Sequence, residues 1–238
     1  MRLILTLLLL YSVLGFSKGI DVHTYIPQQA AQHFDLIRQE VHRLMPDYNY
    51  DWYVAALIEQ ESCISLTHSR CWNSHSRLKT KREEGAGLGQ LTRAWKNGKL
   101  RFDSLTEMKR RYRDELDELK WASVYDRPDL QIRAIILMHK LNYGRLYMIK
   151  DPWIRTQMAD AAYNGGLKGV MVERSVCGLR KGCDPNIWFN NVENNCRKSR
   201  KILYGNRSAC DINREHVYNV TQLRAPKYIL EFIKSKKP

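Results

Sequence analysis

The 238-residue sequence lacks an apolar run long enough to cross a membrane as a helix. Its longest apolar stretch, residues 3–16, is shorter than the roughly 20 residues that a spanning helix needs. A basic start precedes this stretch and small residues follow it, so we expect residues 1–19 to be a secretory signal peptide cleaved after Gly19. Cleavage after Gly15 and an uncleaved N-terminal membrane anchor are the alternatives. Either way, the protein is expected to be exported to the periplasm or cell envelope.

The sequence also lacks any Cys-x-x-Cys pair and any histidine at zinc-ligand spacing from a cysteine. We therefore expect no metal site and no cofactor. An even number of cysteines in an exported chain indicates disulfides. Cysteines that are close in sequence are expected to pair locally, although other connectivities are open. The expected pairs are Cys63 with Cys71, Cys177 with Cys183, and Cys196 with Cys210.

Acidic residues are scarce, with 25 Asp and Glu against 39 Lys and Arg and a formal net charge of +14. This excess predicts an anionic partner: nucleic acid, a membrane surface or an anionic cell wall. Export argues against nucleic acid, as does the absence of a pattern that would make a base-stacking platform. Basic clusters at 79–82, 109–113 and 197–201 are either solvated faces or sites of attraction to an anionic cell envelope. We expect the second.

Internal repeats, low-complexity tracts and Pro/Gly-rich linkers are absent, so residues 20–238 are expected to form a single domain. Apolar residues recur at helical spacing, whereas strand alternation is scarce. The expected class is therefore mainly α, with a small loop or hairpin region within 62–88. Helices are predicted over 28–44, 51–62, 105–119, from Pro128 to about Leu141, over 153–163, and with weaker patterns over 185–203 and from Glu215 onward.

The predicted helix over 51–62, with Asp51 as its N-cap, ends on a carboxylate. Val54, Leu57 and Ile58 share one helical face with Glu61, by steps of three and four. The three apolar residues should pack inward, which places Glu61 where the core meets a cleft. Partial burial there would favour the protonated carboxylic acid that a glycosidase uses on its leaving group. The alternative is a helix-end glutamate tied to a nearby arginine.

Three short motifs occur in a fixed order: Glu61-Ser62, the glycine-rich run at 85–92, and Ala-Ala-Tyr-Asn-Gly-Gly at 161–166. Together they resemble the soluble lytic transglycosylases, lysozyme-like helical enzymes related in fold to goose-type lysozyme. The resemblance covers roughly residues 51–228. It implies a lysozyme-like catalytic domain that acts on peptidoglycan glycan strands, with Glu61 as the catalytic acid. The substrate-binding residues that it implies are Ser62, Ser76, Gln90, Tyr163, Asn164 and Tyr218.

Several of these assignments have structural alternatives. Gln90 offers a donor and an acceptor for an acetamido or peptide group, or it braces its loop. Tyr218, which matches a tyrosine expected near the catalytic glutamate, could equally be a core aromatic. The gap from Ser62 to Gly85 is longer than the family's, which leaves Ser76 as the best match for its second serine. Gly89 replaces the family's common methionine and should widen or reshape the cleft wall.

The reaction implied by the resemblance cleaves the β-1,4 bond between MurNAc and GlcNAc and leaves a 1,6-anhydroMurNAc end. A hydrolytic lysozyme on the same fold is the nearest alternative, and it would need a second carboxylate from Asp160, Glu83 or Glu84. An inactive cell-wall-binding protein is the other. We expect a monomer. The biological setting is open between a phage endolysin, which we favour, a virion-associated wall-piercing enzyme and a bacterial secretion-linked enzyme.

Overall fold

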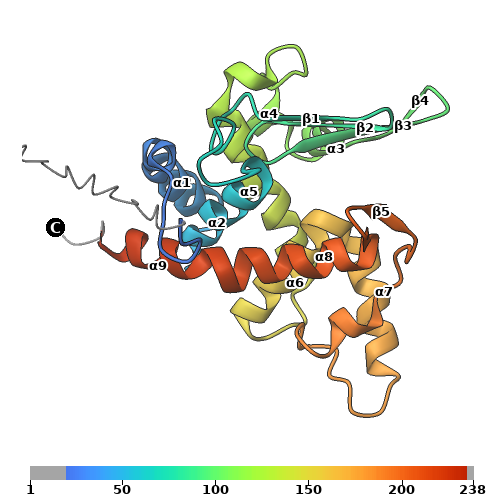
Figure 1. The fold of residues 1–238 in the computed structure, drawn as a ribbon. Coiled ribbons are helices and arrows are strands. Elements are labelled where there is room, and N and C mark those ends of the chain that lie inside the picture. Colours follow the sequence, from blue (N-terminus) through green and yellow to red (C-terminus); the bar gives the residue numbers. More distant parts are fainter. Residues whose placement is uncertain (1–19, 235–238) are drawn as a thin grey trace, which may run out of the picture.

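The computed structural model describes residues 20–234, so the predicted signal peptide at 1–19 lies outside the described residues. The expected mainly helical class is confirmed, with a small antiparallel sheet (Figure 1). The α-helices are α1 (Ala31–Leu44), α2 (Asp51–Ser62), α3 (Ser104–Arg111), α4 (Arg113–Leu116), α5 (Pro128–Arg145), α6 (Pro152–Gly165), α7 (Leu167–Gly178), α8 (Ala209–Tyr218) and α9 (Ala225–Lys234). The short helical elements are η1 (Gln28–Ala30), η2 (Val124–Asp126), η3 (Val192–Asn195) and η4 (Asn219–Arg224).

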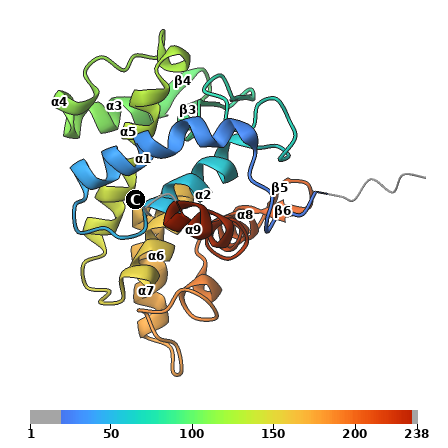
Figure 2. The same cartoon turned by 90° about the vertical axis from the view of Figure 1, so that its left-hand side faces the viewer.

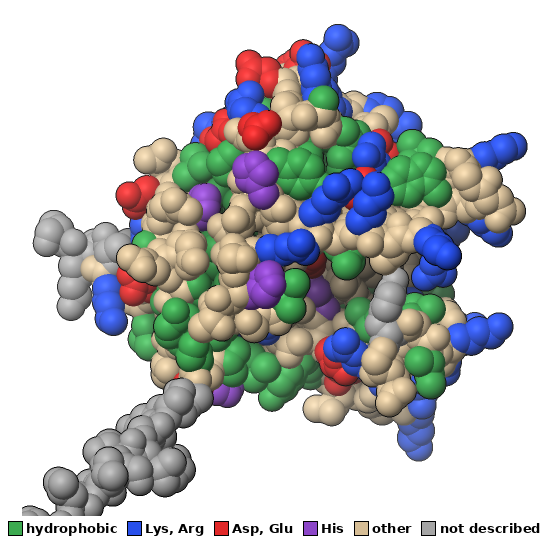
Figure 3. Space-filling view, turned by 45° about the horizontal axis from the view of Figure 1, so that its top comes forward, with side chains coloured by type: hydrophobic (Ala, Val, Ile, Leu, Met, Phe, Trp, Pro, Cys, Tyr) green, Lys and Arg blue, Asp and Glu red, His purple; other side chains and the backbone are tan. Residues whose placement is uncertain are grey.

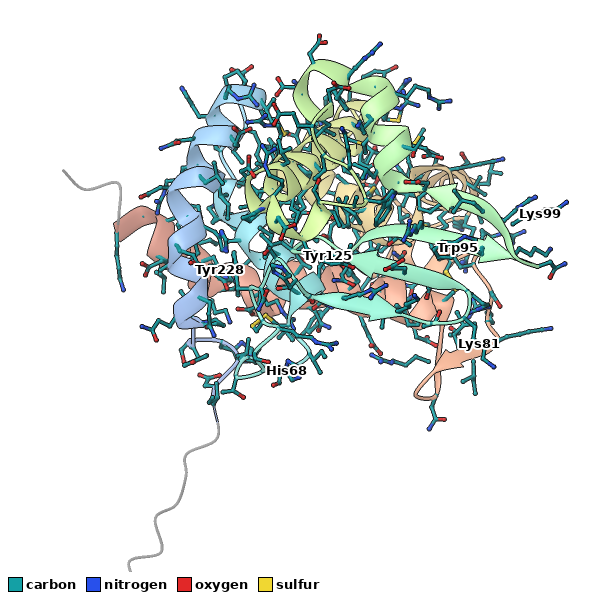
Figure 4. All side chains as sticks on the ribbon, turned by 90° about the horizontal axis from the view of Figure 1, so that it is seen from above. His68, Lys81, Trp95, Lys99, Tyr125 and Tyr228 are labelled. Atoms are coloured by element: carbon teal, nitrogen blue, oxygen red, sulfur yellow. A yellow bond between two sulfur atoms is a disulfide. The ribbon has the colours of Figure 1, made fainter. Side chains whose placement is uncertain are left out.

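The main sheet joins β1 (Arg77–Lys79), β2 (Glu83–Ala86), β3 (Leu91–Lys96) and β4 (Lys99–Asp103) in sequence order. The expected hairpin region near 62–88 therefore exists, but the sheet continues to residue 103. The turn signal is Asn97-Gly98, where both residues have positive φ, as a tight hairpin turn that matches strand twist requires. Figure 4 shows Lys81 and Lys99 at the outer ends of the hairpins, pointing away from the body.

The larger hydrophobic core lies among α1, α2, α5 and α9. Its fully buried residues include Ile37 from α1, Leu57 from α2, Ile132 from α5 and Phe232 from α9. Figure 2 shows α9 end-on beside α2, with α1 lying across them. Because α2 is packed on several sides in this core, its C-terminal end is held at a defined position.

A second core is formed by α6, α7, α8 and the segment after α7. Met158, Val170, Trp188 and Val217 are buried in it. In Figure 1, α8, η4 and α9 form one long rod that runs along both cores. The C-terminal end of α6 and the start of this rod thereby lie next to the end of α2.

Two helix predictions were wrong in part, and one helix was missed. The helix expected over 105–119 is divided at Tyr112, whose φ of −132° is not helical, into α3 and α4. The segment 185–203 contains only η3 and the start of the two-stranded sheet of β5 (Ile202–Tyr204) and β6 (Arg207–Ser208). Asparagine amides in this segment donate to nearby backbone carbonyls, as Asn191 does to Phe189 and Asn195 does to Asn191, and such residues favour turns over helix. Helix α7 was not predicted.

The expected disulfides are confirmed: Cys63–Cys71, Cys177–Cys183 and Cys196–Cys210. Three disulfides fit an oxidising compartment. The first closes the loop directly after α2, and the other two fasten the loops around the second core. Among residues 20–234, no helix has both the length and the apolar character that a membrane crossing requires.

Candidate functional site

Helix α2 brings Glu61 to the edge of the larger core. Val54, Leu57 and Ile58 are buried as expected, and the Glu61 side chain on the same face is 15% exposed. The helix begins one residue earlier than expected, since Tyr50 is the N-cap and Asp51 is the first helical residue. The predicted position of Glu61, between core and solvent, is therefore the observed one.

Glu61 is bonded to a buried histidine and not to an arginine. The His216 Nε2 atom of α8 lies 2.7 Å from Glu61 Oε1. On its other side, His216 Nδ1 lies 2.9 Å from Asp160 Oδ2 of α6, and Tyr53 donates its hydroxyl to Asp160 Oδ1 at 2.7 Å. Asp160 has no exposed surface and the His216 side chain is 4% exposed. Three helices thus build one chain of polar groups that starts in the interior and ends at Glu61.

The charges of this chain favour a protonated histidine. Burial by itself lowers the pKa of His216, but the carboxylates of Asp160 and Glu61 more than offset it and raise that pKa to about 10. At neutral pH the ring is therefore an imidazolium that donates to both carboxylates. The prediction that partial burial favours the protonated form of Glu61 did not take this cation into account.

Glu61 borders two adjoining hollows in the surface. One, of about 550 Å³, lies between the sheet, α3, α5 and the end of α6, and the other, of about 430 Å³, extends over the loop after α2 and the first two strands. The two share Glu61, Gln90, Thr92 and Asn164. A third hollow of about 510 Å³ continues from the first past Arg111. The result is an extended groove with Glu61 in its wall, open to an extended ligand on both sides.

The glycine-rich loop forms the wall opposite α6. Gln90 has a positive φ of 46° and donates its amide to Gly87 O at 2.9 Å, so it braces the loop while it also lines the groove. Tyr163 donates its hydroxyl to Gly89 O at 2.7 Å. A side chain at Gly89 would collide with Ile135 and with that hydroxyl. Ile135 and Tyr163 thus occupy the space that a side chain at position 89 would need.

The two serines border the groove with hydroxyls that serve the backbone. Ser62, which is buried, donates to Ile58 O at 2.7 Å and accepts from the Trp72 amide at 3.0 Å. Ser76, also buried, donates to Ser62 O at 3.3 Å. These contacts hold the end of α2 and the loop that follows it. Asn164 is different, since its side chain is at the exposed end of α6 and accepts from Asn213 at 3.0 Å.

Tyr218 is not near Glu61, and this expectation was wrong. Its side chain is 50% exposed and packs edge-to-face on Phe189. The residue of α8 that points inward to Glu61 is His216, two positions before Tyr218. A histidine in an amphipathic helix is usually a core or surface residue, so nothing in its local pattern indicated the contact with Glu61.

The acidic candidates for a second carboxylate are now separable. Asp160 is enclosed behind His216 and does not line the groove. Glu84 is buried in the sheet, where Arg77 and Arg93 bind it and, against the effect of burial, lower its pKa. Only Glu83 of these three lines a hollow that Glu61 also lines. Among the acids predicted from the sequence, a hydrolytic mechanism would therefore depend on Glu83; Glu107 of α3 lines the other hollow together with Glu61.

A comparison with models of protein families finds no match, and no curated protein is significantly similar to this chain. Across residues 20–234 no cluster of three or more His, Cys, Asp or Glu side chains has an arrangement suited to a metal ion.

Proposed function

We propose that this protein is an exported peptidoglycan lytic transglycosylase with a lysozyme-like fold, in which Glu61 is the general acid and base. One observation carries the proposal. The carboxylate of Glu61, which is largely buried at a helix end, lies in the wall of an extended groove, beside Gln90, Tyr163 and Asn164. These are the residues of the three motifs that resemble the family, and they come from segments far apart in the chain. The substrate is a glycan strand that lies along the groove.

In this mechanism Glu61 donates its proton to the glycosidic oxygen between MurNAc and GlcNAc. The bond from C1 to that oxygen breaks, and the MurNAc C6 hydroxyl forms a new bond to C1. Its proton passes to Glu61, which restores the acid. No water is consumed, and the attacking hydroxyl belongs to the substrate, so the enzyme has no need to hold a second nucleophile.

The positive charge of the protein suits an anionic target. In Figure 3, Lys and Arg side chains gather on the projecting ends of the sheet and of the β5–β6 hairpin. With a net charge of +14, these surfaces would attract the anionic envelope before the groove engages a strand. The disulfides and this attraction support action outside the cytoplasm.

A hydrolytic lysozyme is the second candidate, because Glu83 lines the same hollow as Glu61. A hydrolase of this kind needs its second carboxylate to hold the attacking water or to act as the nucleophile. Glu83→Gln would then abolish activity as completely as Glu61→Gln. The transglycosylase mechanism gives Glu83→Gln a loss of less than about tenfold.

The test is digestion of purified peptidoglycan by the wild-type protein and both variants, with muropeptides identified by mass spectrometry. We expect anhydro ends from the wild type and from Glu83→Gln, and almost no release by Glu61→Gln. Wild-type-like release by a folded Glu61→Gln variant would overturn the proposal. Activity that is lost in both variants, with reducing MurNAc ends from the wild type, would support the lysozyme.

A further inference from the structure

The contact between Glu61 and His216 leaves the two oxygens of Glu61 in different situations. Oε1 is held by His216 Nε2 at 2.7 Å. Among residues 20–234, no hydrogen bond or ion pair engages Oε2. Because Glu61 lines the groove, this second oxygen is the one that can reach a bound strand. We call Oε1 the fixed oxygen, because His216 holds it, and Oε2 the working oxygen, because it can exchange a proton with the substrate.

Asp160 decides where the protons of His216 reside. It accepts from Tyr53 at Oδ1 and bonds to His216 Nδ1 at Oδ2, so both of its oxygens act as acceptors inside the core. Nδ1 therefore keeps its hydrogen. The opposite nitrogen, Nε2, then faces Glu61 as the site whose proton can respond to pH.

We propose that His216, oriented by Asp160, is a positioning residue for Glu61 that fixes the direction of its working oxygen. This inference rests on the proposed role of Glu61 and adds a pH dependence to it. The contact keeps its positive charge as long as His216 is protonated, and the charge is lost as pH rises towards the His216 pKa of about 10.

The same cation assists the chemistry once Glu61 is protonated on Oε2. As the proton leaves for the glycosidic oxygen, the negative charge that develops on Glu61 is already faced by the imidazolium. A preorganised charge of this kind stabilises the transition state without rearrangement. His216 thus raises the rate at which Glu61 transfers its proton.

Other charged and titratable groups around α8 are engaged elsewhere. From α6, Tyr163 bonds to the Gly89 carbonyl. On the outer side of α8, Glu215 pairs with Arg207 of β6. Beyond α8, Arg224 of η4 lies 3.4 Å from Glu59 and so belongs to a different cluster. Glu61 and Asp160 are the carboxylates that hydrogen-bond directly to His216.

The first experiment does not depend on activity. The histidine ring nitrogens are followed by NMR against pH in the wild type, in Glu61→Gln and in Asp160→Asn, with the His216 signals assigned by through-bond correlation to the backbone. We expect wild-type His216 to remain an imidazolium above pH 8. Its titration should move at least about one pH unit lower in either variant, because each removes one neighbouring charge. A wild-type His216 that titrates near pH 6.5, as an exposed histidine does, would overturn the inference and leave the proposed function untouched.

The second experiment uses the pH profile of peptidoglycan cleavage. His216→Gln keeps an amide donor for Oε1 but lacks the charge. We expect the maximal rate to fall at least about tenfold, and the decline in activity that follows deprotonation of His216 near pH 10 in the wild type to be absent. His42→Gln, at an exposed position on α1, should change neither. A His216→Gln profile that is lowered equally at every pH would show a merely structural role.

His216→Gln alters a buried residue, so its folding must be verified by circular dichroism. Should that variant not fold, the NMR titration of Glu61→Gln still decides the inference, because Glu61 is at the edge of the core.

Discussion

Helix α2 carries two glutamates, two residues apart, that face opposite kinds of surroundings. Glu61 lies in the groove wall and is bonded to His216 of α8. Glu59 has no exposed surface and lies against the far end of the same C-terminal rod, where Lys227 Nζ is 2.8 Å from Oε1 and Tyr228 donates to Oε2 at 2.6 Å. Both carboxylates meet a cation, yet only one keeps a free oxygen beside a hollow.

The difference distinguishes structural from chemical use of the same residue type. Around Glu59, Trp72 donates to Tyr228 at 3.1 Å, and Lys227 also donates to the Val22 and Tyr25 carbonyls. This cluster fastens α2, α9 and the segment before α1 to one another. Around Glu61 the chain of partners stops at the groove, which leaves one end available to a ligand.

The largest expected effect is on stability, from Glu59→Gln. It removes the buried charge that compensates Lys227, and burial already lowers the pKa of that lysine in spite of Glu59. Loss of one partner of a buried ion pair costs about 3–5 kcal/mol. Urea unfolding should show this loss. Protein that remains folded should keep the wild-type rate per molecule, and a selective loss of rate at full stability would erase the contrast between the two glutamates.

The next effect is on catalysis, from Glu61→Gln. We expect at least about a hundredfold loss of peptidoglycan cleavage, the scale of general acid–base catalysis. The free energy of unfolding should change by much less than in Glu59→Gln, since Glu61 is partly exposed and an amide can still bond to His216. Cleavage assays and urea unfolding on the same samples provide the check.

Two buried histidines, His139 and His216, also lie in opposite surroundings, and they should affect the pH dependence of stability in opposite ways. His139 lies among the rings of Tyr48, Tyr53 and Tyr143, and burial lowers its pKa to about 3. Below pH 6.5, His139 binds a proton in the unfolded chain but stays neutral in the folded chain. This residue therefore destabilises the fold progressively as pH falls towards 3. His216, with its pKa raised to about 10, stabilises the fold below pH 6.5, and this contribution is lost as pH rises towards 10.

Each of these contributions should reach about 5 kcal/mol across its full window. Thermal melts over pH 4–9 would separate them. His139→Phe should reduce the loss on the acid side, and His216→Gln should reduce the loss on the alkaline side. If the two variants retain the wild-type slopes, the opposite charge states assigned to the two residues are wrong.

The smallest effect concerns the projecting sheet. Lys81→Gln with Lys99→Gln should weaken binding to intact cell walls by a few-fold at low salt, and the difference should disappear at high salt, where screening is effective within about 3 Å. Lys140→Gln with Lys150→Gln removes the same charge from exposed positions elsewhere and is the matched control. Equal losses in both pairs would indicate that only net charge matters.

The sequence allowed the prediction of features that are local along the chain. Helical spacing placed α1, α2 and α5, and closeness in sequence indicated all three disulfides. Glu61 was identified because apolar residues on its own helix face defined where it must lie. The β3–β4 hairpin was missed although Asn97-Gly98 is its turn signal, since its strands alternate weakly between polar and apolar residues.

Contacts between distant segments were beyond reach of local patterns. Glu61 and His216 are 155 positions apart in the sequence, and their contact depends on how α8 packs against α2 and α6. For the same reason Tyr218 was assigned to the groove although the inward face of α8 carries His216. The burial of Ser62 and Ser76 likewise follows from how the loop folds back on the end of α2.

The proposed function is tested most directly by digesting purified peptidoglycan in heavy-oxygen water. A lytic transglycosylase closes the C6 oxygen onto C1 and consumes no water, so the new ends should be 1,6-anhydroMurNAc without the heavy isotope. A hydrolase adds one oxygen from solvent at each cut. Reducing MurNAc ends that carry the label, in amounts matching the bonds cleaved, would contradict the account and assign the groove to a lysozyme.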